Sequence, residues 1–194
     1  MTKSISRRGL LAAAAGGAAF AALPALPAKP ALAVSDEELA YANFSVSSEL
    51  LLADLYEKAL AGTSVTGDAR STLRICRHAA LQHARALSGL LAGAGQDAPT
   101  AEDFAFQWPD RAFATPAATG ATARTVLQAL LGVYQTAVTA VSEPSYRTLY
   151  ASLAASIGQQ LGALTALGLR GVVEPFPVAV DLERASSALE PYLG

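Results

Sequence analysis

The sequence predicts an all-α fold: a four-helix bundle with one long crossover between its second and third helices and a short C-terminal helix. Four segments carry apolar residues at alternating steps of three and four, the spacing of a helix that buries one face in a bundle. No segment of convincing length alternates apolar and polar residues as a half-buried strand does. The connection after the second segment is too long for a tight hairpin, so the chain is expected to cross the bundle there.

The first 33 residues are predicted to be a targeting segment. Lys3, Arg7 and Arg8 precede an apolar run, and Ala-Leu-Ala at 31–33 is a small-residue cleavage site. The paired arginines resemble the twin-arginine export signal, which implies export of an already folded protein to the periplasm, cell envelope or exterior. We predict a signal peptide over 1–33 and one domain over 34–194. The alternative is a retained membrane anchor, for which the apolar run is short.

The predicted mature chain is acidic. It has 10 basic and 16 acidic residues, a net charge of −6, so no basic surface for nucleic acid is expected. After signal cleavage no other apolar stretch is long enough to span a membrane. Cys76 is the single cysteine, which excludes an internal disulfide even in an oxidising compartment. The domain must therefore be held together by packing.

The first two helices have recognisable ends. Ser-Asp-Glu-Glu at 35–38 is a capping box with acidic first-turn residues, and it predicts a first helix over about 36–61 that Gly62 ends. Gly-Asp at 67–68 opens the second helix, which ends near Gly-Ala-Gly at 93–95.

A long connection precedes the second helix pair. Residues 96–121 contain three prolines and four aromatic side chains, which are expected to fix the connection across the bundle: Phe104, Phe106, Trp108 and Phe113. A third helix is predicted over 122–142 and a fourth over about 145–168, separated by Glu-Pro at 143–144. The tail is predicted to contain an extended proline-rich piece and a short helix from Asp181.

A carboxylate lies in the apolar seam of the first helix. Glu49 falls among the inward positions, where an ionised group is costly to bury. His83 has an inward position on the second helix. Cys76 shares that face two turns away and is interpreted as a buried, inert thiol. His78 and Asp54 are expected on the solvent side.

Several segments resemble the exported ferritin-like proteins that include the desiccation-related proteins. The matching segments are SELLLADLYEKAL, AALQHARAL, VLQALLGVYQTA, SIGQQLGALTAL and the closing VEPFPVAVDLERASSALEPYLG. The resemblance covers nearly all of 36–194, with Glu49 and His83 at ligand positions and Tyr134 as a marker of helix register. It implies a ferritin-like bundle, in which two metal ions are held by a Glu from each of two helices and a Glu-x-x-His from each of the others.

The other four ligand positions carry no ligand. They fall on Ala80, Leu127, Gly158 and Leu161, and no register restores a Glu-x-x-His anywhere in the chain. One Glu and one His cannot balance the charge of two metal ions or fill their coordination. The resemblance therefore implies a degenerate site in which Glu49 and His83 are vestigial. No cofactor and no catalytic residue is expected.

Two functions follow from this interpretation. The first is an exported, non-catalytic structural or interaction protein that has lost its di-iron site, with a protein partner or further copies of itself, in which Glu49 and His83 form a buried hydrogen-bonded pair. The alternative is a metal-binding or redox protein that uses iron or manganese at a reduced site of Glu49, His83 and water. The export signal favours the alternative, because many cargoes of that route load a cofactor before export. A related option is a subunit that accompanies an intact partner.

Overall fold

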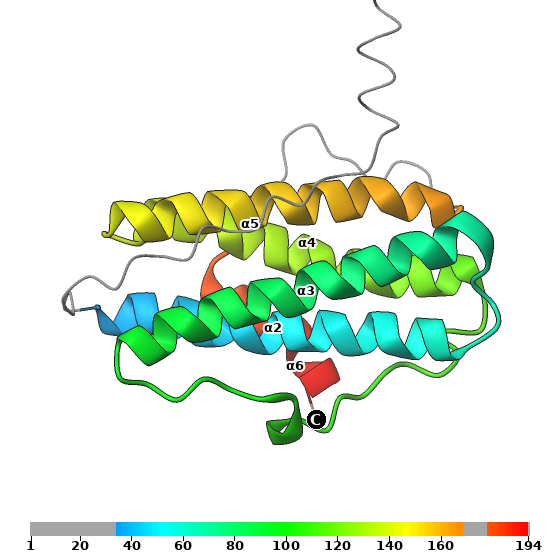
Figure 1. The fold of residues 1–194 in the computed structure, drawn as a ribbon, viewed down its shortest axis with the longest axis horizontal. Helices are drawn as coiled ribbons and strands as arrows, with labels where there is room; N and C mark the ends of the chain where they lie inside the picture. Colours follow the sequence, from blue (N-terminus) through cyan, green and yellow to red (C-terminus); the bar gives the residue numbers. More distant parts are fainter. Residues whose placement is uncertain (1–33, 169–177, 194) are drawn as a thin grey trace, which may run out of the picture.

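The computed structural model describes residues 34–168 and 178–193, and within these residues the regular structure is helical, with no strand. The elements are α2 (Asp36–Ala61), α3 (Gly67–Gly93), η1 (Ala101–Asp103), α4 (Pro116–Ala140), α5 (Pro144–Ala163), η2 (Leu164–Leu167) and α6 (Leu182–Leu193), shown in Figure 1. The two η elements are short 3₁₀ segments. The predicted all-α bundle with a short C-terminal helix is confirmed.

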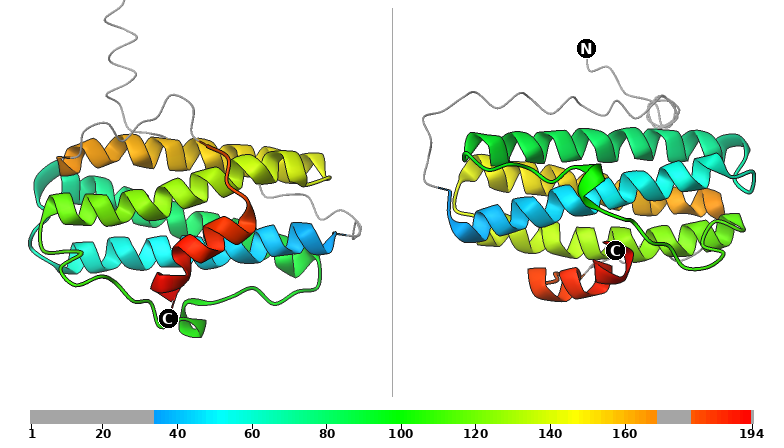
Figure 2. Two further views of the ribbon diagram at one scale, coloured as in Figure 1. Left: turned by 180° about the vertical axis from the view of Figure 1, so that it is seen from behind. Right: turned by 90° about the horizontal axis from the view of Figure 1, so that it is seen from below.

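The bundle is built from two antiparallel helix pairs, α2 with α3 and α4 with α5, and α2 also packs against α4 (Figure 1). The connection over residues 94–115 runs along the outside of α2 and joins the two pairs as the predicted crossover. Helix α6 lies across the outer side of α4 and α2, outside the four-helix core (Figure 2). None of the described helices is long and apolar enough to cross a bilayer.

The predicted capping box starts α2 and also connects two parts of the bundle. Glu38 Oε2 accepts hydrogen bonds from the Ser35 N–H at 2.9 Å and the Ser35 hydroxyl at 3.1 Å. Its other oxygen, Oε1, accepts from the Ser142 N–H at 2.7 Å and the Glu143 N–H at 3.3 Å. Because Ser142 and Glu143 form the turn between α4 and α5, one carboxylate joins the start of α2 to that turn.

The third and fourth helices differ from their predicted bounds. Helix α4 starts at Pro116, earlier than the predicted residue 122, because the Thr115 hydroxyl caps it by accepting the Ala118 N–H at 3.1 Å. Proline at the first helical position suits this start, since its missing N–H would have no partner there. Helix α5 ends at Ala163, and the predicted continuation to residue 168 is the 3₁₀ segment η2.

Trp108 anchors the crossover to the bundle. Its Nε1–H donates to Asp54 Oδ2 at 2.7 Å, and its ring packs edge-on against Phe113 and tilted against Tyr192 of α6. Asp54 is therefore half-buried under the crossover, and the prediction that it is exposed was wrong. The sequence places Asp54 beside the seam, but it does not show that a distant tryptophan covers this position.

Candidate functional site

Glu49 of α2 and His83 of α3 meet inside the bundle. The Glu49 side chain is 0% exposed and His83 is 7% exposed. His83 Nδ1 lies 3.0 Å from Glu49 Oε1, within hydrogen-bonding distance. The buried pair expected between these two helices is therefore present.

Tyr134 of α4 is a third member of the cluster. Its hydroxyl donates to Glu49 Oε1 at 2.7 Å, and its side chain is fully buried. The same carboxylate oxygen thus accepts from two different helices. The sequence interpretation used Tyr134 only as a register marker and missed this contact. The available signal was a hydroxyl-bearing ring at an inward position where an apolar side chain would otherwise be expected.

Three of the ligand positions assigned from the resemblance lie on α4 and α5. Leu127 is the α4 residue assigned to a ligand position, and Tyr134 of the same helix reaches Glu49. Leu127 lies two turns from Tyr134, about 10 Å along the helix axis, and is fully buried. In α5, Gly158 is only half-buried and faces open space, whereas Leu161 is buried.

The surroundings of His83 favour its charged form. Burial alone would lower the pKa of the imidazole, but the Glu49 carboxylate and its hydrogen bond outweigh burial and raise the pKa above its ordinary value. Burial, together with the charge of Glu49, raises the pKa of Tyr134 well above its ordinary range. Tyr134 therefore stays protonated and donates to Glu49, and the raised pKa of His83 favours its protonated form.

A second polar layer lies further along the bundle. The Tyr56 hydroxyl donates to Gln160 Oε1 at 2.8 Å, and it also lies near the thiol of Cys76. Burial raises the pKa of that thiol to about 11, so it remains protonated near neutral pH. The interpretation of Cys76 as a buried thiol agrees with its position, and His78 is exposed as expected.

Some buried polar atoms of this core have no hydrogen-bond partner among the described residues. They include Glu49 Oε2, Ser48 Oγ, Ser156 Oγ and Gln160 Nε2. Buried polar atoms in folded proteins usually bond to protein or to ordered water. Glu49 Oε2 is thus the one carboxylate oxygen of the cluster that remains able to accept another donor.

The donor set does not fit a two-metal centre. Helices α4 and α5 contain no Asp, Glu, His or Cys at all, so no shift of register could supply a ligand from either of them. Ala80 is buried on α3 at the position assigned to a second-helix carboxylate. No group of three or more His, Cys, Asp or Glu side chains suited to a metal ion occurs among the described residues. Glu49 and His83 alone supply too few charges and donors for two metal ions.

The family of the chain follows from its comparison with known domains. The family model described as a ferritin-like domain matches residues 37–168, from the first turn of α2 to the end of η2. Comparisons with curated proteins and with solved structures give no significant match. The match covers more than half of the chain and all four helices of the bundle. The chain therefore belongs to the ferritin-like domain family.

Proposed function

We propose that this protein is an exported ferritin-like bundle that has lost its di-iron site and acts as a non-catalytic structural or interaction protein outside the cytoplasm. The observation that carries the proposal is the composition of the core around Glu49. One carboxylate oxygen receives Tyr134 and His83, and neither α4 nor α5 offers another ligand. The paired arginines of the first 33 residues support export, although these residues lie outside the described ones. The partner is a second protein or further copies of this chain.

One observation favours a second candidate, a metal-binding or redox protein with a reduced site. Glu49 Oε2 is buried and has no partner among the described residues. An unused carboxylate oxygen beside an imidazole could contribute to binding a single iron or manganese ion, with water completing the coordination. In that case Glu49 and His83 would hold the ion, and Tyr134 would orient the carboxylate.

Metal analysis of the untagged protein separates the two candidates. We expect iron, manganese and zinc well below one equivalent per chain, both as purified and after incubation with each metal and desalting. The double variant Glu49→Ala, His83→Ala serves as the reference, and circular dichroism checks that it is helical. Stoichiometric metal that disappears in the double variant would contradict the proposal and establish the alternative. Copurification of a metal-containing partner from the exported fraction would instead identify an accompanying subunit.

A further inference from the structure

Three tyrosine rings form a chain of contacts from the core to the edge of the bundle. Tyr134 of α4 packs against Tyr150 of α5 with ring centroids 5.9 Å apart, and Tyr150 packs against Tyr41 of α2 with centroids 6.5 Å apart. Exposure rises along the chain, from 0% at Tyr134 to 1% at Tyr150 and 5% at Tyr41. Burial and the nearby charges of the exposed Glu37 and Asp181 raise the pKa of Tyr41, so its hydroxyl lies toward the charged surface.

Tyr134 is the member of this chain whose hydroxyl bonds to a carboxyl group. Its O–H donates to Glu49 Oε1 at 2.7 Å, the usual length of an O–H···O bond. A phenol that loses an electron becomes strongly acidic, so its oxidation is favoured by a proton acceptor within hydrogen-bond reach. Glu49 Oε1 is such an acceptor, and His83, 3.0 Å from the same oxygen, still touches solvent.

Tyr56 is a matched tyrosine without a proton acceptor. It is also fully buried, and its hydroxyl donates to Gln160 Oε1 at 2.8 Å. A carboxamide accepts a hydrogen bond but does not take up the proton. Tyr150 lies near Ser45, and no carboxylate bonds to its hydroxyl among the residues that the structure describes. Tyr134 is therefore easier to oxidise to a neutral radical than Tyr56 or Tyr150.

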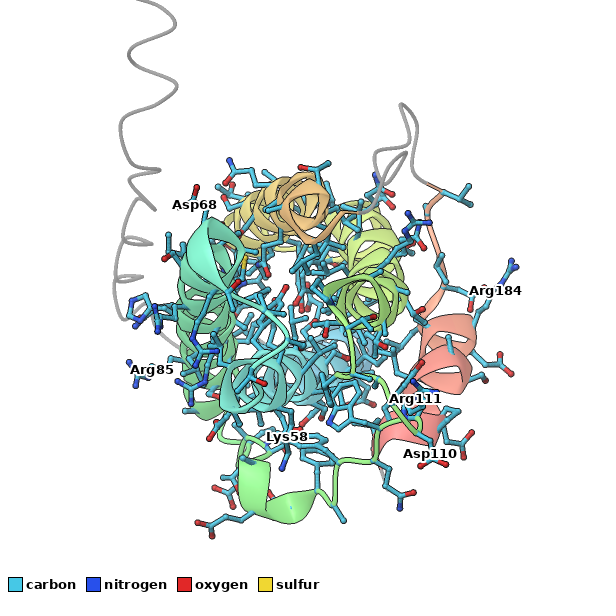
Figure 3. The ribbon with its side chains drawn as sticks, turned by 90° about the vertical axis from the view of Figure 1, so that its right-hand side faces the viewer. Lys58, Asp68, Arg85, Asp110, Arg111 and Arg184 are labelled. Atoms are coloured by element: carbon cyan, nitrogen blue, oxygen red, sulfur yellow. The ribbon has the colours of Figure 1, made fainter. Side chains whose placement is uncertain are left out.

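Burial separates an oxidised Tyr134 from other molecules. Seen along the bundle, side chains fill the space between the four helices, and labelled charged groups such as Asp68 and Arg85 lie around the outside (Figure 3). Phenoxyl radicals on exposed tyrosines decay by coupling in pairs, but a radical enclosed in this core has no second radical within reach. An electron can still enter or leave, because the ring contacts to Tyr150 and Tyr41 connect the core with the surface.

We propose that Tyr134 is a reversible one-electron redox site, oxidised through Tyr41 and Tyr150 by one-electron oxidants in solution, such as peroxyl or azide radicals. In the net reaction one electron passes from Tyr134 to the oxidant, which becomes its anion. The phenolic proton moves to Glu49 Oε1 and leaves a neutral phenoxyl radical. A one-electron reductant restores the phenol, and the proton returns from Glu49. This activity goes beyond the proposed structural or interaction role and does not rest on it.

Pulse radiolysis with azide radicals tests the site, because these radicals oxidise tyrosine and tryptophan side chains by one electron. We expect the purified, untagged protein to form a long-lived phenoxyl radical, followed by its absorption and by electron paramagnetic resonance of frozen samples. Its decay should be first-order and independent of protein concentration, whereas radicals on exposed tyrosines decay by second-order coupling. Absence of a long-lived, first-order phenoxyl radical would overturn the proposal.

Two matched variants assign the radical to one residue. Tyr134→Phe and Tyr56→Phe each remove one fully buried hydroxyl and keep the ring. We expect the long-lived radical to be lost in Tyr134→Phe and kept in Tyr56→Phe, because Tyr56 has a carboxamide as its acceptor. Circular dichroism checks that both variants are helical. The opposite pattern, or the same signal in both variants, would contradict the assignment to Tyr134.

Further variants test the proton acceptor and the electron path. Glu49→Gln keeps a hydrogen-bond acceptor beside Tyr134 but does not take up the proton, so the long-lived radical should be lost. Tyr41→Phe should lower the yield of this radical, whereas Tyr192→Phe, at a partly exposed ring outside the chain of contacts, should leave the yield unchanged. A radical that persists in Glu49→Gln, or equal yields from Tyr41→Phe and Tyr192→Phe, would show that the proposed path is wrong.

Discussion

Glu49 Oε1 accepts one hydrogen bond from the Tyr134 phenol and one from the His83 imidazole, inside a core that is otherwise mostly apolar. These two hydrogen bonds satisfy one oxygen of a carboxyl group that lies in the apolar seam of a helix. Removing one partner of a buried ion pair leaves an uncompensated charge, at a cost of about 3–5 kcal/mol. We therefore expect His83→Leu to lower the free energy of unfolding by an amount in this range, measured by urea titration.

The raised pKa of His83 makes stability depend on pH in a defined direction. The folded protein holds the imidazole proton more tightly than the unfolded chain, whose histidine has a pKa of about 6.5. The stabilisation is fully present below that unfolded value and is lost as the pH rises through the folded pKa. We expect the free energy of unfolding to fall by up to about 1.4 kcal/mol per pH unit across this window.

Two variants separate this effect from other titrations. His83→Gln should remove the pH dependence in this window, because it keeps a polar side chain but cannot titrate. His78→Gln changes an exposed histidine on the same helix and should leave the dependence intact. A pH dependence that persists in His83→Gln would show that another group causes it.

Glu38 is a second buried carboxylate. Its pKa is lowered, whereas the pKa of His83 is raised. Burial alone would raise the pKa of this carboxyl group, but hydrogen bonds from the N–H groups of Ser35, Ser142 and Glu143 outweigh burial and lower it. The resulting stabilisation is present above the unfolded pKa of about 4.3 and is lost as the pH falls through the folded value. We expect Glu38→Gln to lower the free energy of unfolding by about 1.5–3 kcal/mol at pH 7. Glu37→Gln, at an exposed neighbour, should have little effect in the same chemical denaturation series.

At the scale of elements, the segment before α6 crosses α4 at Gly132. The Val180 N–H donates to the Gly132 carbonyl at 3.1 Å, and the Thr136 hydroxyl donates to the Val180 carbonyl at 2.8 Å. A Cβ on Gly132 would lie 2.6 Å from Val180 Cγ2 and 3.0 Å from the Val178 carbonyl oxygen. Glycine is thus required at this position, because any side chain would push the crossing segment off the helix.

Alanine substitutions at two glycines should have opposite effects. Gly132→Ala should destabilise the protein and speed protease cleavage ahead of α6, because the clash outweighs the gain in helix propensity. Gly158→Ala, in the interior of α5 with nothing within 4 Å of the added methyl group, should stabilise by about 0.5–1 kcal/mol. Thermal unfolding and limited proteolysis of both variants measure these opposite changes in stability. A Gly132→Ala protein as stable as Gly158→Ala would show that the crossing segment moves without cost.

The helices were more predictable from the sequence than their contacts. The capping box at Ser35 and the break at Pro144 depend on neighbouring residues, and both have the predicted structure. The start of α4 was predicted too late, because Thr115 and Pro116 were included in the proline-rich connection. The bond from Trp108 to Asp54 joins residues far apart in the chain, and no local pattern specifies it.

At the scale of the whole molecule, the sequence predicted which two helices meet at the polar cluster but not the third. Glu49 and His83 are both chemically unusual in an apolar seam, so each could be identified alone. Tyr134 looks like an ordinary large core residue until the relative shift of α2 and α4 along the bundle axis is known. Helical periodicity gives the inward face of each helix, but it does not give this axial shift, so the bond from Tyr134 to Glu49 was not predicted.

We expect the whole folded domain to be exported by a route that requires Arg7 and Arg8. Replacing Arg7 and Arg8 by lysine keeps the positive charge but removes the planar guanidinium groups, which lysine does not replace in recognition. We expect this variant to accumulate in the cytoplasm as full-length protein, measured by fractionation and immunoblotting. The unaltered chain should appear outside the cytoplasm with Val34 as its first residue, measured by mass spectrometry.

The control is Lys3→Arg, which changes a basic residue outside the arginine pair and should leave export unchanged. A chain that is exported equally well with both arginines replaced would contradict the twin-arginine route. An exported chain that keeps residues 1–33 would instead contradict cleavage and favour the anchored form.

The bundle relies on packing and buried hydrogen bonds, with Cys76 as its single cysteine, so it can fold without a disulfide. Folding in a reducing cytoplasm before export is therefore compatible with this core.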